Sequence, residues 1–331
     1  MTFNHKLNDF KLILPLLNDI QMHQTTNTIL MIRPVSFRMN EQTAVNNYFQ
    51  EDLDLKNTEI NAKAQVEFDG FVEKLRSVGV HVIVENDDKL MDTPDSIFPN
   101  NWVSFHENGD VAIYPMFAEN RRKERREEIF MILEQEGFHI ENIIDYTSAE
   151  SDGYFLEGTG SVVLDRVNGK AYCALSPRAD EELFIEFCED FEYTPIVFIA
   201  NQTVEGKRLP IYHTNVMMCV AETFAVVCLD AIDDKHDRKN LIKHLKESKK
   251  EIIEISEEQM ANFAGNMLQV RGTDDKRILV MSQSAHDSLT TLQISKISMH
   301  CKILSSSLET IETCGGGSAR CMMAEVFLPK E

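Results

Sequence analysis

The sequence predicts an α/β fold built from repeated units in which two strands are followed by one helix. Short apolar segments typical of strands alternate with amphipathic segments typical of helices along most of the chain. Strand pairs are separated by the Asn-Gly turns 108–109 and 168–169, which favour tight hairpins. The unit recurs about every 50 to 60 residues, a period typical of repeat architectures rather than of a doubly wound sheet.

The first clear elements begin after residue 27. Ile29–Ile32 is an apolar run stopped by Arg33-Pro34, which predicts a buried strand. Apolar residues within 68–78 recur at helical spacing, Gly79 suits the helix end, and a strand is expected at 80–84. Further strands are expected at 102–105, 110–114, 161–165, 170–175, 195–200, 214–220, 223–229, 250–255, 277–281 and 300–304. Further helices are expected at 120–136, 179–190, 234–248 and 284–292.

Length and composition set the domain organisation. The chain has 331 residues, of which 43% are hydrophobic, enough for a full core. No stretch rich in Pro, Gly or Ser forms a linker, so residues 27–331 are expected to make a single domain. Residues 1–26 are expected to be a polar leader.

Charge and cysteine content exclude several classes of partner. With 33 basic and 54 acidic residues, the net charge is −21, which disfavours binding to nucleic acid or an anionic membrane surface. The basic cluster 121–126 is interleaved with glutamates and is interpreted as a solvated helix face. The apolar stretch 12–17 is too short to span a membrane or serve as a signal-peptide core. Seven cysteines at irregular spacing do not suggest disulfides, so a cytoplasmic location is expected.

Motifs for cofactors and metals are not found. Gly158-Thr159-Gly160 precedes a strand rather than a helix, and Gly315-Gly316-Gly317 is not followed by Lys-Ser/Thr. Neither CxxC nor HExxH occurs. We therefore expect no nucleotide, no other cofactor and no metal.

Cys321 is the strongest candidate nucleophile. It follows the run Gly315–Gly317, and consecutive glycines persist where the backbone turns tightly or approaches a ligand. Arg320 is adjacent, and a nearby cation favours the thiolate. The alternative is a structural cysteine beside a loose loop.

The segment Gly-Gly-Gly-Ser-Ala-Arg-Cys resembles the nucleophile loop of the arginine deiminase and amidinotransferase superfamily, the penteins. This resemblance implies a five-bladed pseudo-symmetric α/β propeller of ββαβ units. Segment 155–163 resembles the family's Glu-Gly-Gly-Asp motif and implies that Glu157 holds substrate nitrogens. Tyr212-His213-Thr214-Asn215 resembles His-x-Asp and implies that His213 is the general acid/base, with Asn215 replacing Asp.

Two further segments match the family. Residues 95–103 resemble the segment that ends in Arg-Asp before a strand, so Asn101 or Asp95 is expected to contact substrate. Trp102 is interpreted as a core residue. Segment 174–180 resembles a loop of the methylarginine hydrolases in which Arg pairs with the substrate α-carboxylate; the role is implied for Arg178, and a charged first helical turn explains it equally well. Other arginines that could pair with that carboxylate are Arg33, Arg38, Arg121 and Arg271.

The sequence is most similar to the citrulline-utilisation hydrolases, which share a start like 31–40, Phe-Pro-Asn-Asn-Trp at 98–102 and Cys-Gly-Gly-Gly. Amides at Asn101 and Asn215 can donate to a ureido carbonyl, which favours citrulline over arginine. The expected reaction is citrulline to ornithine, ammonia and carbon dioxide through a covalent Cys321 intermediate. Backbone N–H groups of Gly316 and Gly317, or Asn215, are expected to stabilise the oxyanion.

Three alternatives remain open at this point. The first is a deiminase or dihydrolase of arginine or methylarginine, in which Asp95 and Glu157 supply paired carboxylates. The second is an amidinotransferase, and the third is a non-catalytic binding protein of the same fold. The expected partner is a small amino acid; a homodimer is allowed, although no pattern requires it.

Overall fold

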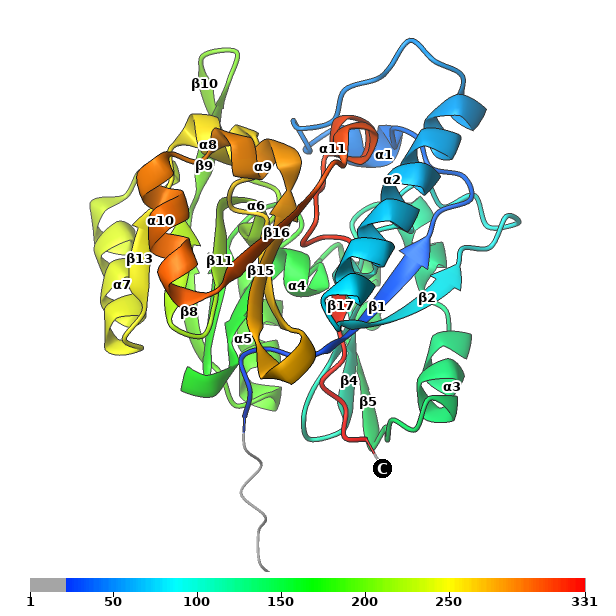
Figure 1. Ribbon diagram of the computed structural model, residues 1–331, viewed down its shortest axis with the longest axis horizontal. Helices are drawn as coiled ribbons and strands as arrows, with labels where there is room; N and C mark the ends of the chain where they lie inside the picture. Colours follow the sequence, from blue (N-terminus) through cyan, green and yellow to red (C-terminus); the bar gives the residue numbers. More distant parts are fainter. Residues whose placement is uncertain (1–21, 331) are drawn as a thin grey trace, which may run out of the picture.

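The computed structural model describes residues 22–330. Over these residues the chain forms five three-stranded sheets and one two-stranded hairpin, with helices around them (Figure 1). In every three-stranded sheet the first strand is antiparallel to the middle one, and the middle strand is parallel to the third. One or two helices connect the middle strand to the third. The predicted unit of two strands, helix and strand is therefore confirmed.

The bounds of the elements follow, taken sheet by sheet and then helix by helix. The sheets are β17(Ala324–Glu325)-β1(Thr28–Arg33)-β2(His81–Asn86), β3(Val103–Phe105)-β4(Asp110–Ile113)-β5(Asn142–Asp145), β6(Val162–Asp165)-β7(Lys170–Ala174)-β8(Thr194–Phe198), β11(Met218–Val220)-β12(Phe224–Val227)-β13(Glu251–Glu254) and β14(Leu268–Arg271)-β15(Arg277–Ser282)-β16(Lys302–Ser306), with the hairpin β9(Asn201–Val204)-β10(Lys207–Pro210). The α-helices are α1(Glu41–Ala44), α2(Asn57–Ser77), α3(Glu128–Gln135), α4(Gly158–Ser161), α5(Glu181–Asp190), α6(Thr214–Met217), α7(Lys235–Glu247), α8(Glu257–Ala261), α9(Gln283–Ser288), α10(Thr291–His300) and α11(Glu309–Gly315).

The repeat period agrees with the prediction. The first strands of the sheets begin at residues 103, 162, 218, 268 and 324, at intervals of 50 to 59 residues. Strand β17, near the end of the chain, pairs with β1 near its beginning and completes the first sheet. No sheet closes on itself in the described residues, and the five-bladed propeller stays a prediction.

Several predicted elements were wrong in detail. The stretch 214–220 is not one strand, because the one-turn helix α6 precedes β11. The helix at 284–292 is two helices, since Thr290 caps the start of α10 with its side chain. The helix at 120–136 is a 3₁₀ segment, Glu119–Glu124, followed by α3. Strands β5, β14 and β17 and the β9–β10 hairpin were missed.

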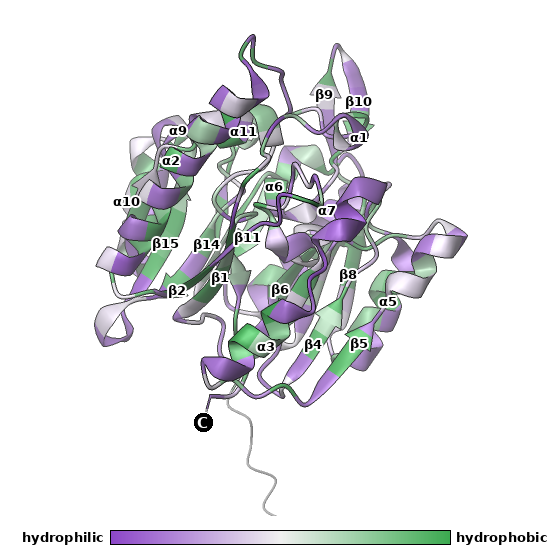
Figure 2. Cartoon of the chain, turned by 90° about the vertical axis from the view of Figure 1, so that its right-hand side faces the viewer, coloured by the Kyte–Doolittle hydropathy of each residue, from purple (hydrophilic) through white to green (hydrophobic). Residues whose placement is uncertain are grey.

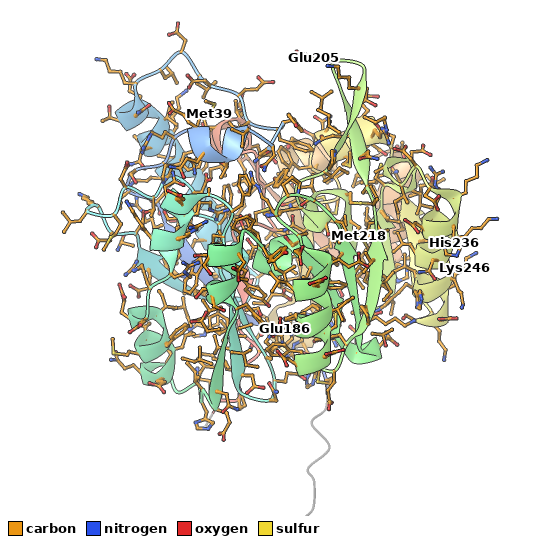
Figure 3. The ribbon with its side chains drawn as sticks, turned by 180° about the vertical axis from the view of Figure 1, so that it is seen from behind. Met39, Glu186, Glu205, Met218, His236 and Lys246 are labelled. Carbon is orange, nitrogen blue, oxygen red and sulfur yellow. The ribbon has the colours of Figure 1, made fainter. Side chains whose placement is uncertain are left out.

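The core lies between the strands and the inward faces of the helices. Helix α2 buries Phe68 and Phe71 against β1 and β2, and Trp102 packs on Phe130, which confirms its core role. Apolar colour concentrates in the strands and polar colour on the outer helices (Figure 2). On α7, His236 and Lys246 lie at the outer edge of the molecule (Figure 3).

The start of the described region packs into the fold. Gln24 is buried and donates from Nε2 to the carbonyls of Leu164 and Val220, while its Oε1 accepts from the Arg166 backbone N–H. Thus part of the expected leader contributes to the core. Residues 1–21 of that leader lie outside the described residues.

None of the helices within residues 22–330 combines the length and the apolar character needed to cross a bilayer.

Candidate active site

The candidate site is formed by five segments, each lying just before the first strand of one three-stranded sheet. Because these strands repeat, the segments that lead into them occupy corresponding positions in the five units. The segments are 100–101 before β3, 157–161 before β6, 213–215 before β11, 265–266 before β14 and 320–321 before β17.

These segments contact one another in a ring. Asn215 Nδ2 donates to the Thr159 carbonyl at 3.2 Å, and Asn266 Nδ2 donates to the Asn215 carbonyl at 3.1 Å. Asn266 Oδ1 accepts from the backbone N–H of Arg320 at 3.0 Å. In the amide orientation that satisfies both of its ends, Asn100 donates to the Cys321 carbonyl and accepts from the backbone of the second segment, which closes the ring.

Glycines allow this close approach. A Cβ at Gly158, which has φ +45°, would lie 2.4 Å from the Asn100 carbonyl oxygen. A Cβ at Gly160 would lie 2.3 Å from Asn101 Nδ2 and 2.7 Å from His213 Nδ1. The Gly158-Thr159-Gly160 sequence therefore serves packing at the centre of the site.

His213 and Glu157 form a buried hydrogen-bonded pair. Each precedes a one-turn helix, α6 and α4 respectively, and His213 Nε2 lies 2.7 Å from Glu157 Oε2. Burial raises the pKa of Glu157, but Arg178, His213 and Arg121 outweigh it and lower that pKa to about 2. Burial lowers the pKa of His213 to about 4 although Glu157 opposes this. An ionised Glu157 accepts the Nε2 proton, so Nδ1 is the basic nitrogen of a neutral imidazole.

This low pKa of His213 predicts acid sensitivity. Below pH 6.5 the unfolded chain protonates this histidine and the folded chain does not until about pH 4, so stability falls over that interval. The loss amounts to about 3 kcal/mol, from roughly 1.4 kcal/mol per pKa unit. Urea unfolding of H213Q between pH 7 and 4 should show a correspondingly smaller loss than wild type.

The exposed His236 provides the control, since H236Q should follow the wild-type pH curve. If H213Q loses as much stability on acidification as wild type, the neutral state of His213 in the folded protein is refuted.

Two buried arginines flank Glu157, and one corrects the sequence analysis. Arg121, interpreted as part of a solvated face, is 2% exposed, binds Glu124 through Nε and Nη2 and donates from Nη1 to Asn101 Oδ1 at 2.8 Å. Arg178 Nη1 lies 3.6 Å from Glu157 Oε2. Alternating charges in sequence resemble a solvated face, but here the Arg121–Glu124 ion pair is enclosed.

Arg178 is also held from its other side. Its Nη2 donates to the Thr43 carbonyl at 2.8 Å, its Nε donates to Asn46 Oδ1 at 2.8 Å, and it lies over the Tyr212 ring. It is buried and precedes α5, which excludes the alternative of a solvated helical turn. Its role toward a substrate carboxylate stays a prediction.

The other candidate arginines lie elsewhere. Arg33, Arg38 and Arg271 pair with surface aspartates, whereas Arg121 lines the cavity beside Cys321.

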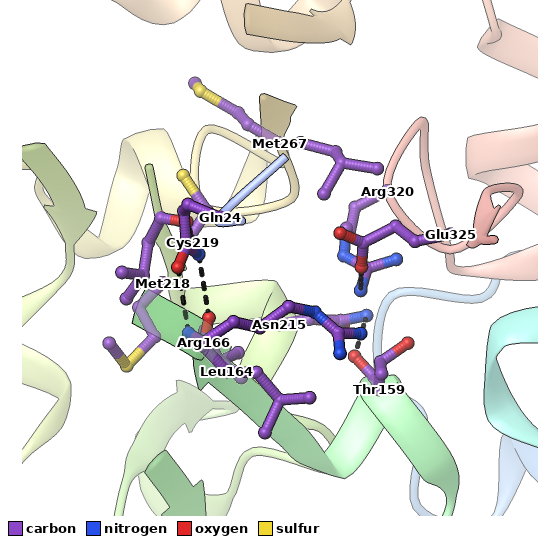
Figure 4. A pocket seen from close by; sticks show the side chains of 13 residues that line it. Gln24, Thr159, Leu164, Arg166, Asn215, Met218, Cys219, Met267, Arg320 and Glu325 are labelled. Atoms are coloured by element: carbon purple, nitrogen blue, oxygen red, sulfur yellow. Dashed lines mark hydrogen bonds and ion pairs between the residues drawn. The ribbon is translucent and has the colours of Figure 1, made fainter. Parts of the chain in front are cut away.

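Cys321 is the last residue of the fifth segment, and only 3% of its surface is exposed. Asn266 Nδ2 lies 3.2 Å from Sγ, and Asn215 Nδ2 lies 3.6 Å from it. The cation predicted beside the thiol is directed elsewhere: Arg320 donates to the Met323 carbonyl and pairs with Glu325 at 2.8 Å. Arg320 thus lines a second cavity, together with Thr159 and Asn215 (Figure 4).

A narrow cavity of about 10 Å³, room for about one water molecule, contains the candidate nucleophile. Asp95 lines it, and its Oδ2 accepts from Asn40 Nδ2 at 2.8 Å and Thr43 Oγ1 at 3.0 Å. Asp95 Oδ1 is buried and has no hydrogen-bond partner among the described residues. An unpaired buried carboxylate oxygen is costly, so this atom indicates where a ligand donor would bind.

The structure brings all the predicted site residues together. Those that line the cavity are Asp95, Asn101, Arg178, His213, Gly317 and Cys321. Glu157 and Asn215 do not line the cavity: Asn215 contacts Cys321, and Glu157 accepts from the Phe117 N–H and pairs with His213, so its expected contact with substrate nitrogens stays a prediction. Gly316 has φ +59° at the end of α11, and its carbonyl accepts from the Tyr212 hydroxyl.

Sequence reasoning missed Asn47, Tyr212 and Asn266. Asn47 donates to the carbonyls of Gly315 and Gly316, and so covers the glycine loop. Asn266 could have been found from the repeat: it precedes the apolar pair Met267-Leu268 as Asn101 precedes Trp102-Val103 and Cys321 precedes Met322-Met323.

A potential metal-binding group occurs elsewhere. Asp234, His236 and Asp237 lie close enough to share an ion at the start of α7, but Asp234 already accepts from the backbone N–H groups of the other two as the helix cap. In the described residues no comparable group lies at the cavity.

Solved structures share this fold. They include apo ArgZ, an arginine dihydrolase from the ornithine-ammonia cycle in Cyanobacteria, with 17% identity, a TM-score of 0.70 and 92% of this chain covered; this chain spans 41% of the ArgZ chain. The product-bound N-terminal domain of ArgZ matches at 17% identity and a TM-score of 0.65, covering 91% of this chain and 99% of that one. An adduct of dimethylarginine dimethylaminohydrolase with S-methyl-L-thiocitrulline matches at 16% identity and a TM-score of 0.60, covering 90% and 98%.

The fold places the chain in the pentein superfamily, as the nucleophile-loop resemblance implied. Within that class, the chain belongs to the family described as "N,N dimethylarginine dimethylhydrolase, eukaryotic", whose profile matches residues 33–328. No curated protein matches the sequence.

Proposed function

We propose that this chain is a cysteine-dependent C–N hydrolase that acts on the guanidino group of arginine and continues to ornithine. The observation that carries the proposal is the unpartnered Asp95 Oδ1, buried in the cavity that contains Cys321 and His213. Arg121 Nε already lies 3.9 Å from the other carboxylate oxygen, Oδ2, and a substrate guanidinium would bring the N–H donors that Oδ1 lacks. Our first expectation was that citrulline is the substrate. The proposal replaces it with arginine, which is converted to ornithine with citrulline as an intermediate.

The amide groups of Asn101 and Asn215 are held by protein contacts, which weakens the argument that they select a ureido substrate alone. The preference for a ureido substrate assumed that the amides of Asn101 and Asn215 are free to face the ligand. In the structure Asn101 Oδ1 accepts from Arg121. The side chain of Asn215 binds Thr159 and Asn266. Their positions are therefore fixed by protein contacts. A site with both carboxylates and amides can accept the cationic guanidinium first and the neutral ureido group afterwards.

The first covalent step forms a C–S bond and releases ammonia. His213 accepts the thiol proton of Cys321, and Sγ attacks the guanidinium carbon. His213 then donates that proton to one terminal amino group, which leaves as ammonia with the electron pair of its C–N bond. The product is a cationic thiouronium on Cys321, so charge is conserved.

Water then releases the ureido product. His213 accepts a proton from water as its oxygen attacks the thiouronium carbon, and the C–S bond breaks with its electrons going to sulfur. The sulfur regains a proton and the second proton goes to solvent, giving citrulline. A second round at the ureido carbon consumes another water and yields ornithine, ammonia and carbon dioxide. Glu157 fixes the imidazole. The Gly316 N–H donates to the Glu312 carbonyl at 2.9 Å, which corrects its expected role, so the Gly317 N–H is the loop donor proposed to stabilise the oxyanion.

We also propose that the five sheets are the blades of a pseudo-symmetric propeller. The regular interval between first strands, the sheet completed by β17 and the ring of contacts among the five segments support this arrangement.

A methylated arginine is the second candidate substrate. The observation that favours it is the match to the dimethylarginine dimethylhydrolase family over residues 33–328. Assaying arginine, citrulline and dimethylarginine in parallel, with ornithine, citrulline and the released amine quantified, discriminates these substrates.

The variant D95N tests the role of Asp95. It keeps the acceptor for Asn40 and Thr43 but removes the negative charge. The kcat/KM for arginine should fall about 10- to 100-fold, corresponding to the roughly 1.5–3 kcal/mol of a hydrogen bond to a charged group. The kcat/KM for citrulline should change less than about threefold, because the ureido group is neutral.

D92N is the matched control, since Asp92 lies three residues before Asp95 and is an exposed carboxylate paired with Arg38. Its kinetics should equal wild type. An equal fall for both substrates in D95N would contradict guanidinium recognition by Asp95, and citrulline turnover without arginine turnover in wild type would restore the first expectation.

A further inference from the structure

The fourth segment of the ring supplies a residue that the proposed reaction has not used. Asn266 is fully buried, follows α8 and leads into β14. Its side-chain nitrogen lies closer to Cys321 Sγ, at 3.2 Å, than Asn215 Nδ2 does, at 3.6 Å. Asn266 lies just before the first strand of its sheet, β14, as Cys321 lies just before β17 in the fifth unit.

The hydrogen bonds of Asn266 fix which end of its amide faces the sulfur. Oδ1 accepts from the backbone N–H groups of Arg320 at 3.0 Å and Cys321 at 3.4 Å. Nδ2 also faces Asn215 Oδ1 at 3.2 Å. Exchanging oxygen and nitrogen would set an NH₂ group against two N–H donors, so the donating end is directed at Sγ.

The backbone around Asn266 is built for this approach. A Cβ at Gly265 would lie 2.2 Å from the Val216 carbonyl oxygen, so only glycine lets this loop pack on α6. Phe263 adopts φ +61°, and its carbonyl accepts from the Asn266 N–H at 2.9 Å. The side chain is therefore held on a turn and does not depend on a flexible rotamer.

We propose that Asn266 is a further residue of the catalytic machinery, which donates its amide N–H to the sulfur of Cys321 and stabilises the thiolate. Donors directed at the charged form of a group favour that form, and they act strongly where water is excluded. Arg320, the adjacent cation, is engaged by Glu325, and Asn215 presents both Nδ2, at 3.6 Å, and Oδ1, at 3.7 Å, to Sγ. The Asn266 amide therefore supplies the positive dipole that the thiolate needs. The inference rests on the proposed role of Cys321 as nucleophile.

The variant N266D separates this role from a structural one. Aspartate keeps an oxygen acceptor for the two backbone N–H groups and replaces the donating NH₂ with an oxygen. N262D is the matched control, because Asn262 is exposed and lies in the same loop. N266A serves as a second variant that introduces no charge.

The readout is the pH profile of Cys321 alkylation by iodoacetamide, followed by peptide mass spectrometry, with thermal unfolding as the fold check. In N266D and N266A we expect the midpoint of the alkylation pH profile to rise by at least about one pH unit. Below that midpoint Cys321 should then react about tenfold more slowly than in wild type. In N262D the midpoint should not shift. With arginine, kcat should fall while KM stays within about twofold, since the contact is with sulfur and not substrate.

Unchanged alkylation midpoints in folded N266D and N266A would overturn the inference. Alkylation needs no substrate, so the test still decides if the wild type fails to hydrolyse arginine, an outcome that would count against the proposed function alone.

Discussion

Replacing Cys321 by serine is expected to abolish ornithine release from arginine while the protein stays folded. The two side chains are nearly isosteric, and Cys321 is 3% exposed, so packing is conserved. A serine hydroxyl ionises far less readily than a thiol, and the neutral His213 in this site is a weak base for it. Loss of a nucleophile of this kind lowers kcat by about 10⁴-fold or more.

C314S is the matched control for this variant. Cys314 is fully buried on α11, seven residues before Cys321, and burial raises the pKa of its thiol to about 11. C314S should therefore retain turnover and the wild-type pH profile of Cys321 alkylation. Substantial activity in C321S, or its loss in C314S alone, would remove Cys321 as the nucleophile.

The repeat pattern of the fold could be predicted from sequence because strands buried on both faces are short and apolar. Apart from the buried strand β14, the missed strands lack this signal. Asn142–Asp145 is largely exposed, and Asn201–Val204 and Lys207–Pro210 form a polar hairpin. Ala324–Glu325 has only two residues, and its place in the first sheet depends on a long-range pairing that no local pattern encodes.

Motifs identified residues that the structure brings together at the candidate site. Glu157, His213 and Cys321 come from three separate units, and the structure brings them to one centre. Burial could not be inferred for Arg121, since charge alternation has the same appearance on a surface and in an enclosed ion pair. Asn266 was missed because strand β14 was not predicted. Without that strand, the position of Asn266 just before it could not be matched to the positions of Asn101 and Cys321 in their units.

Replacing Glu157 by glutamine is expected to remove both activity and stability. Glu157 accepts from the Phe117 N–H at 3.0 Å and from His213 at 2.7 Å, and it faces Arg178. Glutamine can accept from one of these groups, but it leaves the buried guanidinium without its anion and the imidazole without its orienting charge. Breaking a buried ion pair costs about 3–5 kcal/mol. We expect kcat to fall about 10³-fold as the imidazole loses its orientation.

E150Q provides the comparison that isolates the role in the site. Glu150 also accepts from a backbone N–H, that of Met116, and pairs with Arg125 and Arg122, but it lies outside the cavity. Chemical unfolding and arginine turnover should be measured on both variants, with turnover assayed well below the unfolding temperature of each. E150Q should lose stability and keep its kcat, whereas E157Q should lose both. If E157Q keeps kcat within tenfold of wild type, Glu157 balances buried charge only, and His213 needs no carboxylate to act.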